Sequence, residues 1–151
     1  MKYIQYIDSP NGIITLVAND AALIELEFGR RHAATEGNKI TKLAAAQLAE
    51  YFSGARREFS IPLAPAGTKF QKSVWSGLLA IPYGKAISYK QLATNIGRPL
   101  ACRAVGNANG KNPISIIIPC HRVIAADGTI GGYSSGLANK TRLLRIEGID
   151  I

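Results

Sequence analysis

The chain has few of the side chains from which metal sites and disulfide frameworks are built. Its 151 residues include two cysteines, Cys102 and Cys120, and two histidines, His32 and His121. No group of three or four such residues has the spacing of metal ligands, so we expect neither a metal site nor a bound cofactor. Isolated thiols are typical of a reducing compartment, where they remain unpaired. We therefore expect a cytoplasmic protein, or a nuclear one if the cell has a nucleus.

Long hydrophobic runs are also missing. No apolar stretch approaches the roughly 20 residues that a transmembrane helix needs. The first residues are strand-like and lack the layout of a signal peptide. The sequence thus predicts no association with a membrane. With 47% hydrophobic and 19% charged residues, the composition is that of an ordinary globular protein with a sizeable core.

Acidic residues are scarce in only one part of the chain. Residues 1–66 carry seven lysines and arginines and seven acids, whereas residues 67–151 carry eleven basic residues against three acids, a balance of +8. Such a surface favours a polyanionic partner, most plausibly nucleic acid, although a basic solvated surface is the alternative. The step in charge coincides with the linker-like stretch 62–67. We therefore divide the chain into domains at residues 1–66 and 67–151.

The first domain has the pattern of a small α/β unit. Strand-like runs at residues 3–7, 13–18 and 23–28 are separated by the turn signals Ser9-Pro10-Asn11-Gly12 and Asn19-Asp20. They predict an antiparallel meander with one buried face. Residues 39–53 repeat apolar side chains at helical spacing, and Gly54 is placed to end that helix.

The second domain reads mostly as helix. Thr68 is placed to cap one helix, Ser88 opens a short second one, and a third runs from about residue 100 to 108 after the turn Gly97-Arg98-Pro99. Two short helices joined by such a turn form a helix-turn-helix. The last helix is expected at residues 137–147. The sequence therefore predicts an α+β fold in two parts, with an antiparallel sheet in the first and mostly helices in the second.

The third of these helices is built from small residues. Its inward stripe is predicted to consist of Ala101, Ala104, Val105 and Ala108, and its other face of Cys102, Arg103, Gly106, Asn107 and Asn109. A glycine inside a helix costs about 1 kcal/mol relative to alanine, which implies that another surface approaches closely. This composition favours a helix that lies in a groove of nucleic acid. The alternative is that the small residues allow tight helix–helix packing.

Cys120 stands between two apolar runs, with His121 beside it. Burial raises the pKa of a thiol, so a reactive Cys120 needs an activating partner, and a histidine base needs a third group to orient its ring. Glu147 lies on the same helical stripe as Leu144, and a buried carboxylate also requires a partner. These three residues form a plausible activated-thiol system. A small hydrophobe that merely packs is the alternative for Cys120.

The stretch Pro119-Cys120-His121-Arg122-Val123 resembles the active-site signature of the O6-alkylguanine-DNA alkyltransferases, also called methylated-DNA–protein-cysteine methyltransferases. The resemblance covers about residues 68–149 and is carried by further motifs in the same order: Ser88-Tyr89-Lys90-Gln91-Leu92-Ala93, Arg103-Ala104-Val105-Gly106, Asn112-Pro113, Gly132-Tyr133-Ser134, Gly136, Lys140, Leu143-Leu144 and Glu147-Gly148. Several motifs in register are far more specific than the five-residue core. Residues 1–66 fit the family only by pattern.

This resemblance implies a fold and a function. The first domain would be ribonuclease-H-like and the second winged-helix-like. The protein would flip O6-alkylguanine, and also O4-alkylthymine, out of double-stranded DNA and transfer the alkyl group irreversibly to its own cysteine. It would act once, as a monomer. The alternative is a non-catalytic helix-turn-helix protein that senses lesions or regulates transcription, but relatives of that kind replace the acceptor cysteine.

The resemblance also implies catalytic roles. Cys120 would accept the alkyl group, and His121 would relay the thiol proton through a water. Glu147 would orient His121, and Asn112 would hold the turn around the site. Tyr89 would donate its hydroxyl to the guanine ring, which offsets charge on the departing base.

The remaining matched positions would contact the base and the DNA. Arg103 would fill the base stack when the nucleotide is extruded, while small residues of its helix approach the minor groove: Ala101, Ala104 and Gly106. The base pocket would be formed by Val123, Tyr133, Ser134 and Ser135. Ser135 stands where several relatives carry glycine, which bears on the size of the alkyl group that fits.

Overall fold

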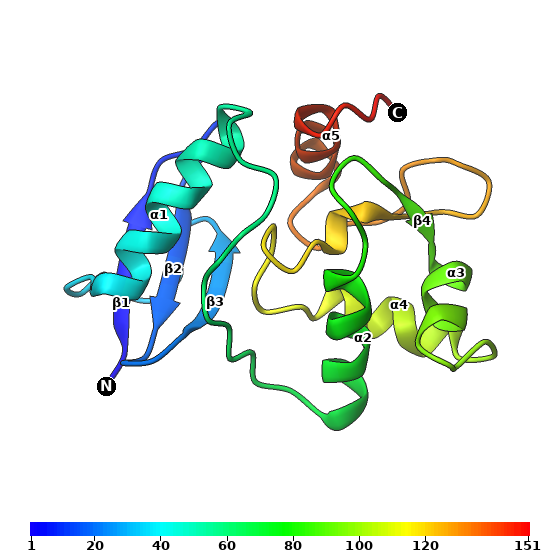
Figure 1. Cartoon of the computed structure of the whole chain (residues 1–151), viewed down its shortest axis with the longest axis horizontal. Helices are drawn as coiled ribbons and strands as arrows, with labels where there is room; N and C mark the ends of the chain where they lie inside the picture. Colours follow the sequence, from blue (N-terminus) through cyan, green and yellow to red (C-terminus); the bar gives the residue numbers. More distant parts are fainter. The chain divides into compact units, whose positions relative to one another are not determined.

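The computed structural model describes residues 1–151 and contains two compact units. The first comprises residues 1–66 with Pro113–Ser115, and the second residues 67–112 with 116–151. The first is a three-stranded sheet with a helix, and the second is mainly helical (Figure 1). The predicted two-part α+β fold is therefore confirmed.

The first unit is an antiparallel meander in the order β1 (Tyr3–Ile7), β2 (Ile14–Ala18), β3 (Leu23–Phe28). Helix α1 (Lys39–Phe52) packs against the sheet, chiefly on β2, as Figure 1 shows. Asn38 caps α1 and forms a capping box with Thr41. All five residues of β2 are buried, because the strand lies in the middle of the sheet and beneath the helix.

The segment Pro113–Ser115 belongs to this first unit although it is distant in sequence. Leu26 donates its N–H to the Pro113 carbonyl at 2.9 Å, and Ser115 donates to the Leu26 carbonyl at 3.0 Å. These two bonds hold the chain against β3 just before it turns toward Cys120. The start of the apolar run is thereby anchored on a sheet edge.

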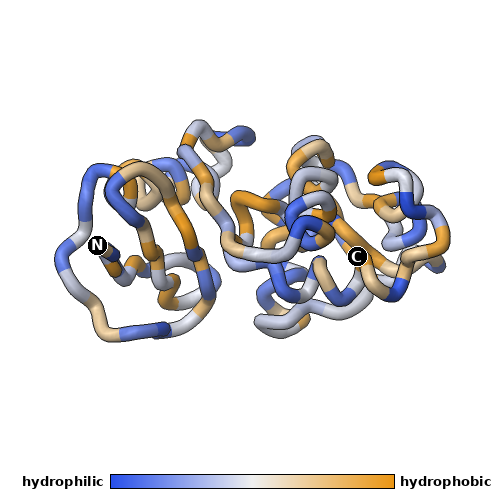
Figure 2. The backbone as a smooth tube through the Cα atoms, turned by 90° about the horizontal axis from the view of Figure 1, so that it is seen from below, coloured by the Kyte–Doolittle hydropathy of each residue, from blue (hydrophilic) through white to orange (hydrophobic).

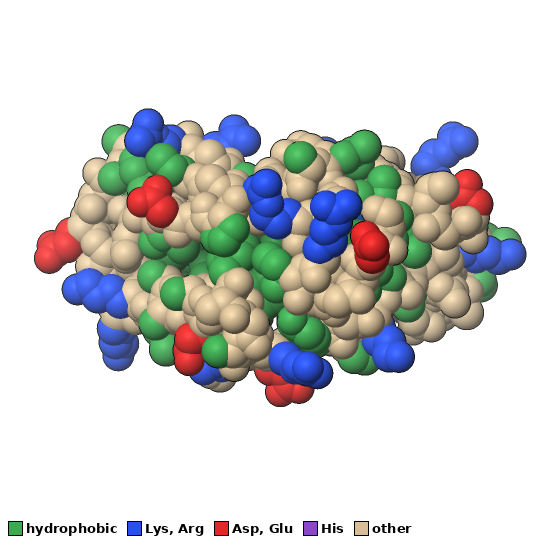
Figure 3. Space-filling view, turned by 90° about the horizontal axis from the view of Figure 1, so that it is seen from above, with side chains coloured by type: hydrophobic (Ala, Val, Ile, Leu, Met, Phe, Trp, Pro, Cys, Tyr) green, Lys and Arg blue, Asp and Glu red, His purple; other side chains and the backbone are tan.

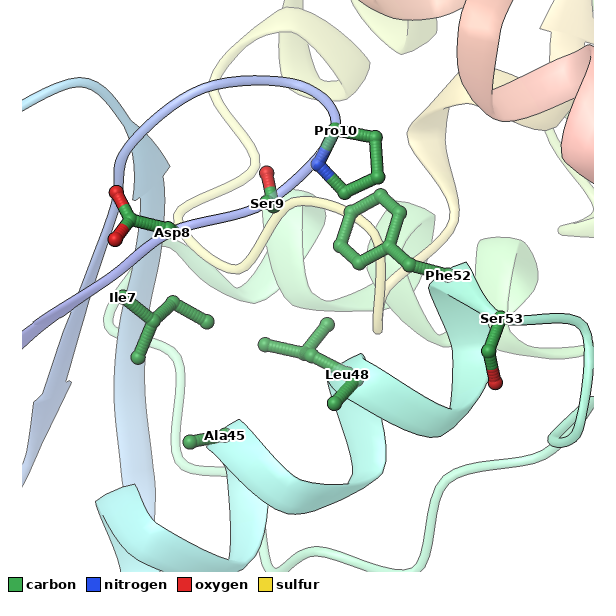
Figure 4. Close-up of a pocket in the computed structure, with 9 residues that line it drawn as sticks. Ile7, Asp8, Ser9, Pro10, Ala45, Leu48, Phe52 and Ser53 are labelled. Atoms are coloured by element: carbon green, nitrogen blue, oxygen red, sulfur yellow. The ribbon is translucent and has the colours of Figure 1, made fainter.

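The first unit also contains an apolar pocket of about 390 Å³ between the β1–β2 turn and α1. Figure 4 shows Ile7 and Leu48 facing one another across it, with Phe52 beside Pro10 at one end. Asp8 is the only charged residue of its lining. Neither the cysteines nor His121 line this pocket.

The second unit contains helices α2 (Lys69–Leu79), α3 (Tyr89–Asn95), α4 (Cys102–Gly110) and α5 (Leu137–Ile146). Helices α2, α3 and α4 pack on one another, and the Trp75 indole donates to the Ala108 carbonyl at 2.9 Å. Gly97, with a φ of +78°, reverses the chain between α3 and α4. Its left-handed conformation suits glycine and completes the helix-turn-helix.

Two findings in this unit correct the sequence-based predictions. A short parallel ladder joins β4 (Ile87–Ser88) to β5 (Val123–Ile124), where no strands were expected. The inward face of α4 is also different: Val105, Ala108 and Asn109 are buried, whereas Ala104 is exposed. The predicted stripe was wrong at Ala104 and Asn109, because the face of α4 that packs against α2 and α3 includes Asn109 and leaves Ala104 exposed.

Hydropathy and charge follow this architecture. The backbone of each unit alternates between apolar and polar stretches (Figure 2). Lys and Arg side chains project from the face seen in Figure 3, and no histidine is visible on that face. None of the helices combines the length and the apolar character that a bilayer crossing requires. No cluster of three or more His, Cys, Asp or Glu side chains is arranged to hold a metal ion.

We predict that the Ser88 cap stabilises the junction of β4 and α3. Its Oγ accepts from the Gln91 N–H at 3.1 Å, and the Gln91 side chain accepts from the Ser88 N–H at 2.7 Å. Ser88→Ala should lower the free energy of unfolding by about 1 kcal/mol, measured by urea denaturation. Ser76→Ala, at an exposed position inside α2, is the matched control and should not destabilise. An equal effect of both changes would contradict the cap.

Candidate active site

A tight turn delivers Cys120 to the interior of the second unit. Asn112 donates its side-chain amide to the Ile118 carbonyl at 2.8 Å, and the Cys120 N–H donates to the same carbonyl at 2.8 Å. Ile116 within this turn has a φ of +70°, which is strained for a β-branched residue. Cys120 then opens the 3-10 turn η1 (Cys120–Arg122) and is 4% exposed. These hydrogen bonds therefore hold the backbone around the thiol in one conformation.

The β4–β5 ladder fixes what surrounds the thiol. Strand β5 follows η1 directly, and its Val123 pairs with Ile87 of β4, two residues before Tyr89. Ser88 is also the N-cap of α3. The ladder thus brings Tyr89, the first residue of α3, to the site of Cys120. The two segments are about thirty residues apart in the sequence.

The Glu147 carboxylate at the end of α5 is the most heavily bonded group of the site. Its Oε2 lies 2.5 Å from Nε2 of His121, and its Oε1 accepts from Arg122 Nε at 2.8 Å. Arg122 Nη2 donates to Oε2 at 3.1 Å, and the Gly84 N–H donates to Oε1 at 3.2 Å. Arg122 Nη1 reaches the Ile81 carbonyl at 2.7 Å. This buried ion pair holds the carboxylate, and through it the imidazole, in one orientation.

His121 is held as a neutral base. Its side chain is fully buried, and burial lowers its pKa, opposed by the hydrogen bond to Glu147. A neutral imidazole that donates its Nε2 proton to Glu147 carries its lone pair on Nδ1. Nδ1 is buried and has no hydrogen-bond partner in the protein. The ring is therefore ready to accept a proton from a group on its Nδ1 side.

The Cys120 thiol is surrounded by groups that oppose the effect of burial. Burial raises its pKa, whereas hydrogen bonds from the Asn112 side chain and the Tyr133 hydroxyl and the charge of Lys140 lower it. Its Sγ lies 3.8 Å from Tyr133 Oη. The thiol is thus protonated at rest, and each neighbour favours the thiolate once the proton leaves.

Lys140 is a site residue to which the sequence analysis gave no role. It is completely buried in α5, and its Nζ donates to the Val123 carbonyl at 2.7 Å and to the Gly132 carbonyl at 2.9 Å. Burial lowers its pKa to about 8. The ammonium ties the loop at Gly132 to β5 beside the thiol. Lys140 stands among the motifs of the family resemblance, and its only physical signal in the sequence is its position on an otherwise buried helical stripe, as for Glu147.

Arg122 was also missed as a binding partner. The position of Glu147 on a buried stripe predicted it as the partner of His121, and the structure brings these two together. It shows in addition that Arg122 neutralises the same carboxylate from one residue further along η1. The sequence does not indicate where the Arg122 side chain points, because the 3-10 turn decides which side chains point inward.

A small pocket opens beside the thiol. It has a volume of about 160 Å³ and is lined by Tyr89, Gly106, Asn109, Gly110, Cys120, Gly132, Tyr133 and Ser134. Val123 and Ser135, which were expected in a base pocket, are not part of this lining. The Val123 carbonyl accepts from Lys140, and the Ser135 carbonyl accepts from the Asn139 side chain at 3.0 Å. Burial raises the pKa of the Tyr89 hydroxyl, which keeps it protonated.

The exposed face of α4 borders this pocket through Gly106. Arg103 and Ala104 are exposed, and Ala101 and Gly106 are half-buried. A Cβ added at Gly106 would meet Tyr89 Cδ1 at 3.7 Å, which is an ordinary van der Waals distance. Packing within the unit therefore does not require glycine here. This favours close approach of an external surface over tight helix–helix packing.

Comparisons with known proteins match both parts of the chain to one family. Residues 69–149 match the DNA-binding domain of 6-O-methylguanine DNA methyltransferase, and residues 2–65 match its ribonuclease-like domain. A methylated-DNA–protein-cysteine methyltransferase of Methanosarcina barkeri is 49% identical over 96% of both chains. The crystal structure of the Mycobacterium tuberculosis O6-methylguanine methyltransferase has a TM-score of 0.89 and 43% identity, over 97% of this chain and 93% of that one.

A crystal structure of Mycobacterium tuberculosis OGT in complex with DNA is also similar. That structure has a TM-score of 0.89 and 45% identity, over 96% of this chain and 92% of the other.

We predict that Arg122 stabilises the site by neutralising Glu147. Arg122→Met leaves a carboxylate with 0% exposure without its cation, which should lower the free energy of unfolding by about 3–5 kcal/mol. Adding Glu147→Gln should recover part of this loss, because no uncompensated charge remains. Urea denaturation measures each value.

The matched control is Arg145→Met, which breaks an exposed pair between the last turn of α5 and Asp150, which follows that helix. It should change the free energy of unfolding by about 1 kcal/mol or less. Strictly additive losses in the double variant, or equal losses at Arg122 and Arg145, would refute the role assigned to Arg122.

Proposed function

Because the chain belongs to the 6-O-methylguanine DNA methyltransferase family, we propose that it repairs alkylated DNA by taking the alkyl group onto its own Cys120. The substrates are O6-alkylguanine and O4-alkylthymine in double-stranded DNA. The observation that carries the proposal is a buried thiol beside a histidine whose other ring nitrogen is fixed by Glu147. A merely structural cysteine has no need of that arrangement.

The reaction is a displacement at carbon. The Cys120 proton passes through a water to Nδ1 of His121, and the resulting imidazolium is stabilised by the Glu147 carboxylate. The sulfur attacks the alkyl carbon as the bond from that carbon to O6 breaks. The electron pair of the broken bond stays on the base, where the Tyr89 hydroxyl donates a hydrogen bond. The proton that left Cys120 is then taken up by the base and restores neutral guanine. The new S–C bond is a thioether, so each molecule acts once.

The small pocket is where the extruded base binds. A thiol with 4% exposure cannot reach O6 of a stacked base, so the nucleotide must leave the duplex, which costs a few kcal/mol. The exposed Arg103 fills the resulting space in the stack. Ala101, Ala104 and Gly106 let α4 approach the minor groove closely, and the Tyr133-Ser134 backbone contacts the O6 edge. The net charge of +8 supports binding that is largely independent of sequence and sensitive to salt.

A non-catalytic lesion sensor is the weaker alternative. Such a protein has no use for an acceptor thiol, whereas here Asn112, Tyr133 and Lys140 all favour the thiolate of Cys120. We further propose that the protein works as a monomer, since one chain supplies every residue of the site. A reducing compartment such as the cytoplasm suits its two free cysteines.

The acceptor role predicts a fixed stoichiometry. When the protein is incubated with an excess of duplex DNA carrying labelled O6-methylguanine, one equivalent of label per protein molecule should appear on the protein. Cys120→Ala should abolish the transfer. Cys102→Ala, which removes the exposed thiol, is the matched control and should retain one equivalent. Several equivalents per molecule would refute single turnover, and tight binding without transfer would support the sensor instead.

If Arg103 fills the space that the extruded nucleotide leaves in the stack, its removal should lower the repair rate by an amount that depends on the substrate. Arg103→Ala should slow repair of duplex DNA by roughly tenfold or more, because the extruded state loses the group that fills the stack. Its reaction with free O6-methylguanine base should be nearly unchanged. Arg98→Ala, which removes an exposed charge from the preceding turn, is the control and should slow duplex repair less. If Arg103→Ala slows the reactions with duplex DNA and with the free base equally, Arg103 does not act by filling the stack.

A further inference from the structure

The pocket beside Cys120 contains a polar group that the proposed reaction does not use. Asn109, near the end of α4, is 5% exposed and lines the pocket together with Tyr89 and Tyr133. Its side-chain oxygen Oδ1 is buried and has no hydrogen-bond partner. A buried acceptor without a donor costs about 1–3 kcal/mol. An unpaired amide at this place is a site for a ligand that carries an N–H group.

The chemistry of the proposed substrate supplies one such group. Alkylation at O6 removes the proton from N1 of guanine, so the exocyclic 2-amino group is the only N–H donor left on the base. Every other polar atom of its edges is an acceptor, which an amide oxygen cannot bind. We propose that Asn109 Oδ1 accepts a hydrogen bond from the 2-amino group of the extruded O6-alkylguanine. This inference rests on the proposed function.

The neighbouring acceptors are compatible with this assignment. The family resemblance implies that the Val123 and Cys120 carbonyls accept from the amino group. The Val123 carbonyl already accepts from Lys140 at 2.7 Å, and the Cys120 carbonyl accepts from the Val123 N–H, so each has one lone pair left. An amino group has two N–H bonds and can be held by two acceptors. Asn109 provides an acceptor that nothing else in the protein occupies.

The consequence is substrate selection. O6-methylhypoxanthine, which is O6-methylguanine without the 2-amino group, has no N–H donor and would leave Oδ1 buried and unpaired. O4-methylthymine has none either. A site built to bind a donor rejects an analogue that lacks it more strongly than an apolar site does. Asn109 therefore makes the protein prefer alkylguanine over alkylthymine, and narrows the substrate range proposed above.

The test uses single-stranded oligonucleotides of one sequence, in which base pairing makes no contribution. They carry either O6-methylguanine or O6-methylhypoxanthine, and the single-turnover rate of methyl transfer to Cys120 is measured for each. The wild-type protein should be faster on O6-methylguanine by about tenfold or more. Asn109→Leu, of similar size and without the acceptor, should slow the guanine substrate about tenfold and leave the hypoxanthine substrate within about twofold.

Two variants separate recognition from structure. Asn109→Asp keeps an acceptor oxygen and should keep the ratio of the two rates, even if its charge slows both reactions. Asn95→Leu, at an exposed position of α3 that has no role in the site, is the matched control and should leave both rates and their ratio unchanged. Thermal unfolding monitors the fold of each variant. The wild-type ratio provides a measurement that needs no variant.

The outcomes are distinct. A substrate ratio that falls toward one in Asn109→Leu alone supports the assignment. Equal slowing of both substrates in Asn109→Leu, or equal rates of the wild-type protein on both, overturns it while leaving the alkyl transfer intact. Absence of transfer from either substrate to the wild-type Cys120 would instead overturn the proposed function itself.

Discussion

The whole site depends on one buried carboxylate. Glu147 receives hydrogen bonds from the imidazole of His121, the guanidinium of Arg122 and the backbone N–H of Gly84. A buried charge is tolerated only when it is paired and hydrogen-bonded. Here two partners come from η1 and the third from the loop before β4, while Glu147 itself ends α5. The group that orients the base is thus also the group that holds these segments together. A change at Glu147 is consequently expected to alter both the orientation of His121 and the stability of these segments.

Lys140 forms a second junction, meaning a buried charged group that joins several segments, and it complements the one at Glu147. Lys140 donates to the carbonyls of Val123 and Gly132, so one buried ammonium joins α5, β5 and the loop that lines the pocket. The two junctions lie on the same helix, seven residues apart, which is two helical turns. Helix α5 therefore presents a positive group to the thiol side and a negative group to the histidine side. This alternation favours transfer of a proton from Cys120 toward His121.

Much of the fold and part of the site could be predicted from the sequence. Alternating strands and a capped helix have strong local periods, so the meander and the helix-turn-helix were found. The contact between Glu147 and His121 followed from a carboxylate on a buried stripe. The β4–β5 ladder was not found, because two-residue strands have no period. Asn109 was placed on the outward face of α4, since its polarity suggested exposure. Arg122 and Lys140 were missed because their roles depend on where a turn and a loop point them.

The protonation of the site is consistent with the acceptor role proposed for the buried thiol. Burial raises the pKa of Cys120 and lowers that of His121, so both groups are neutral at rest. Proton transfer between them creates a thiolate and an imidazolium in a medium of low dielectric, which is unfavourable unless each ion has a partner. Glu147 stabilises the imidazolium, and Lys140 with the Tyr133 hydroxyl stabilises the thiolate. Alkylation then removes the negative charge of sulfur for good, and the leaving base takes up the proton. In the proposed reaction the charged pair is therefore needed only as an intermediate between two neutral states.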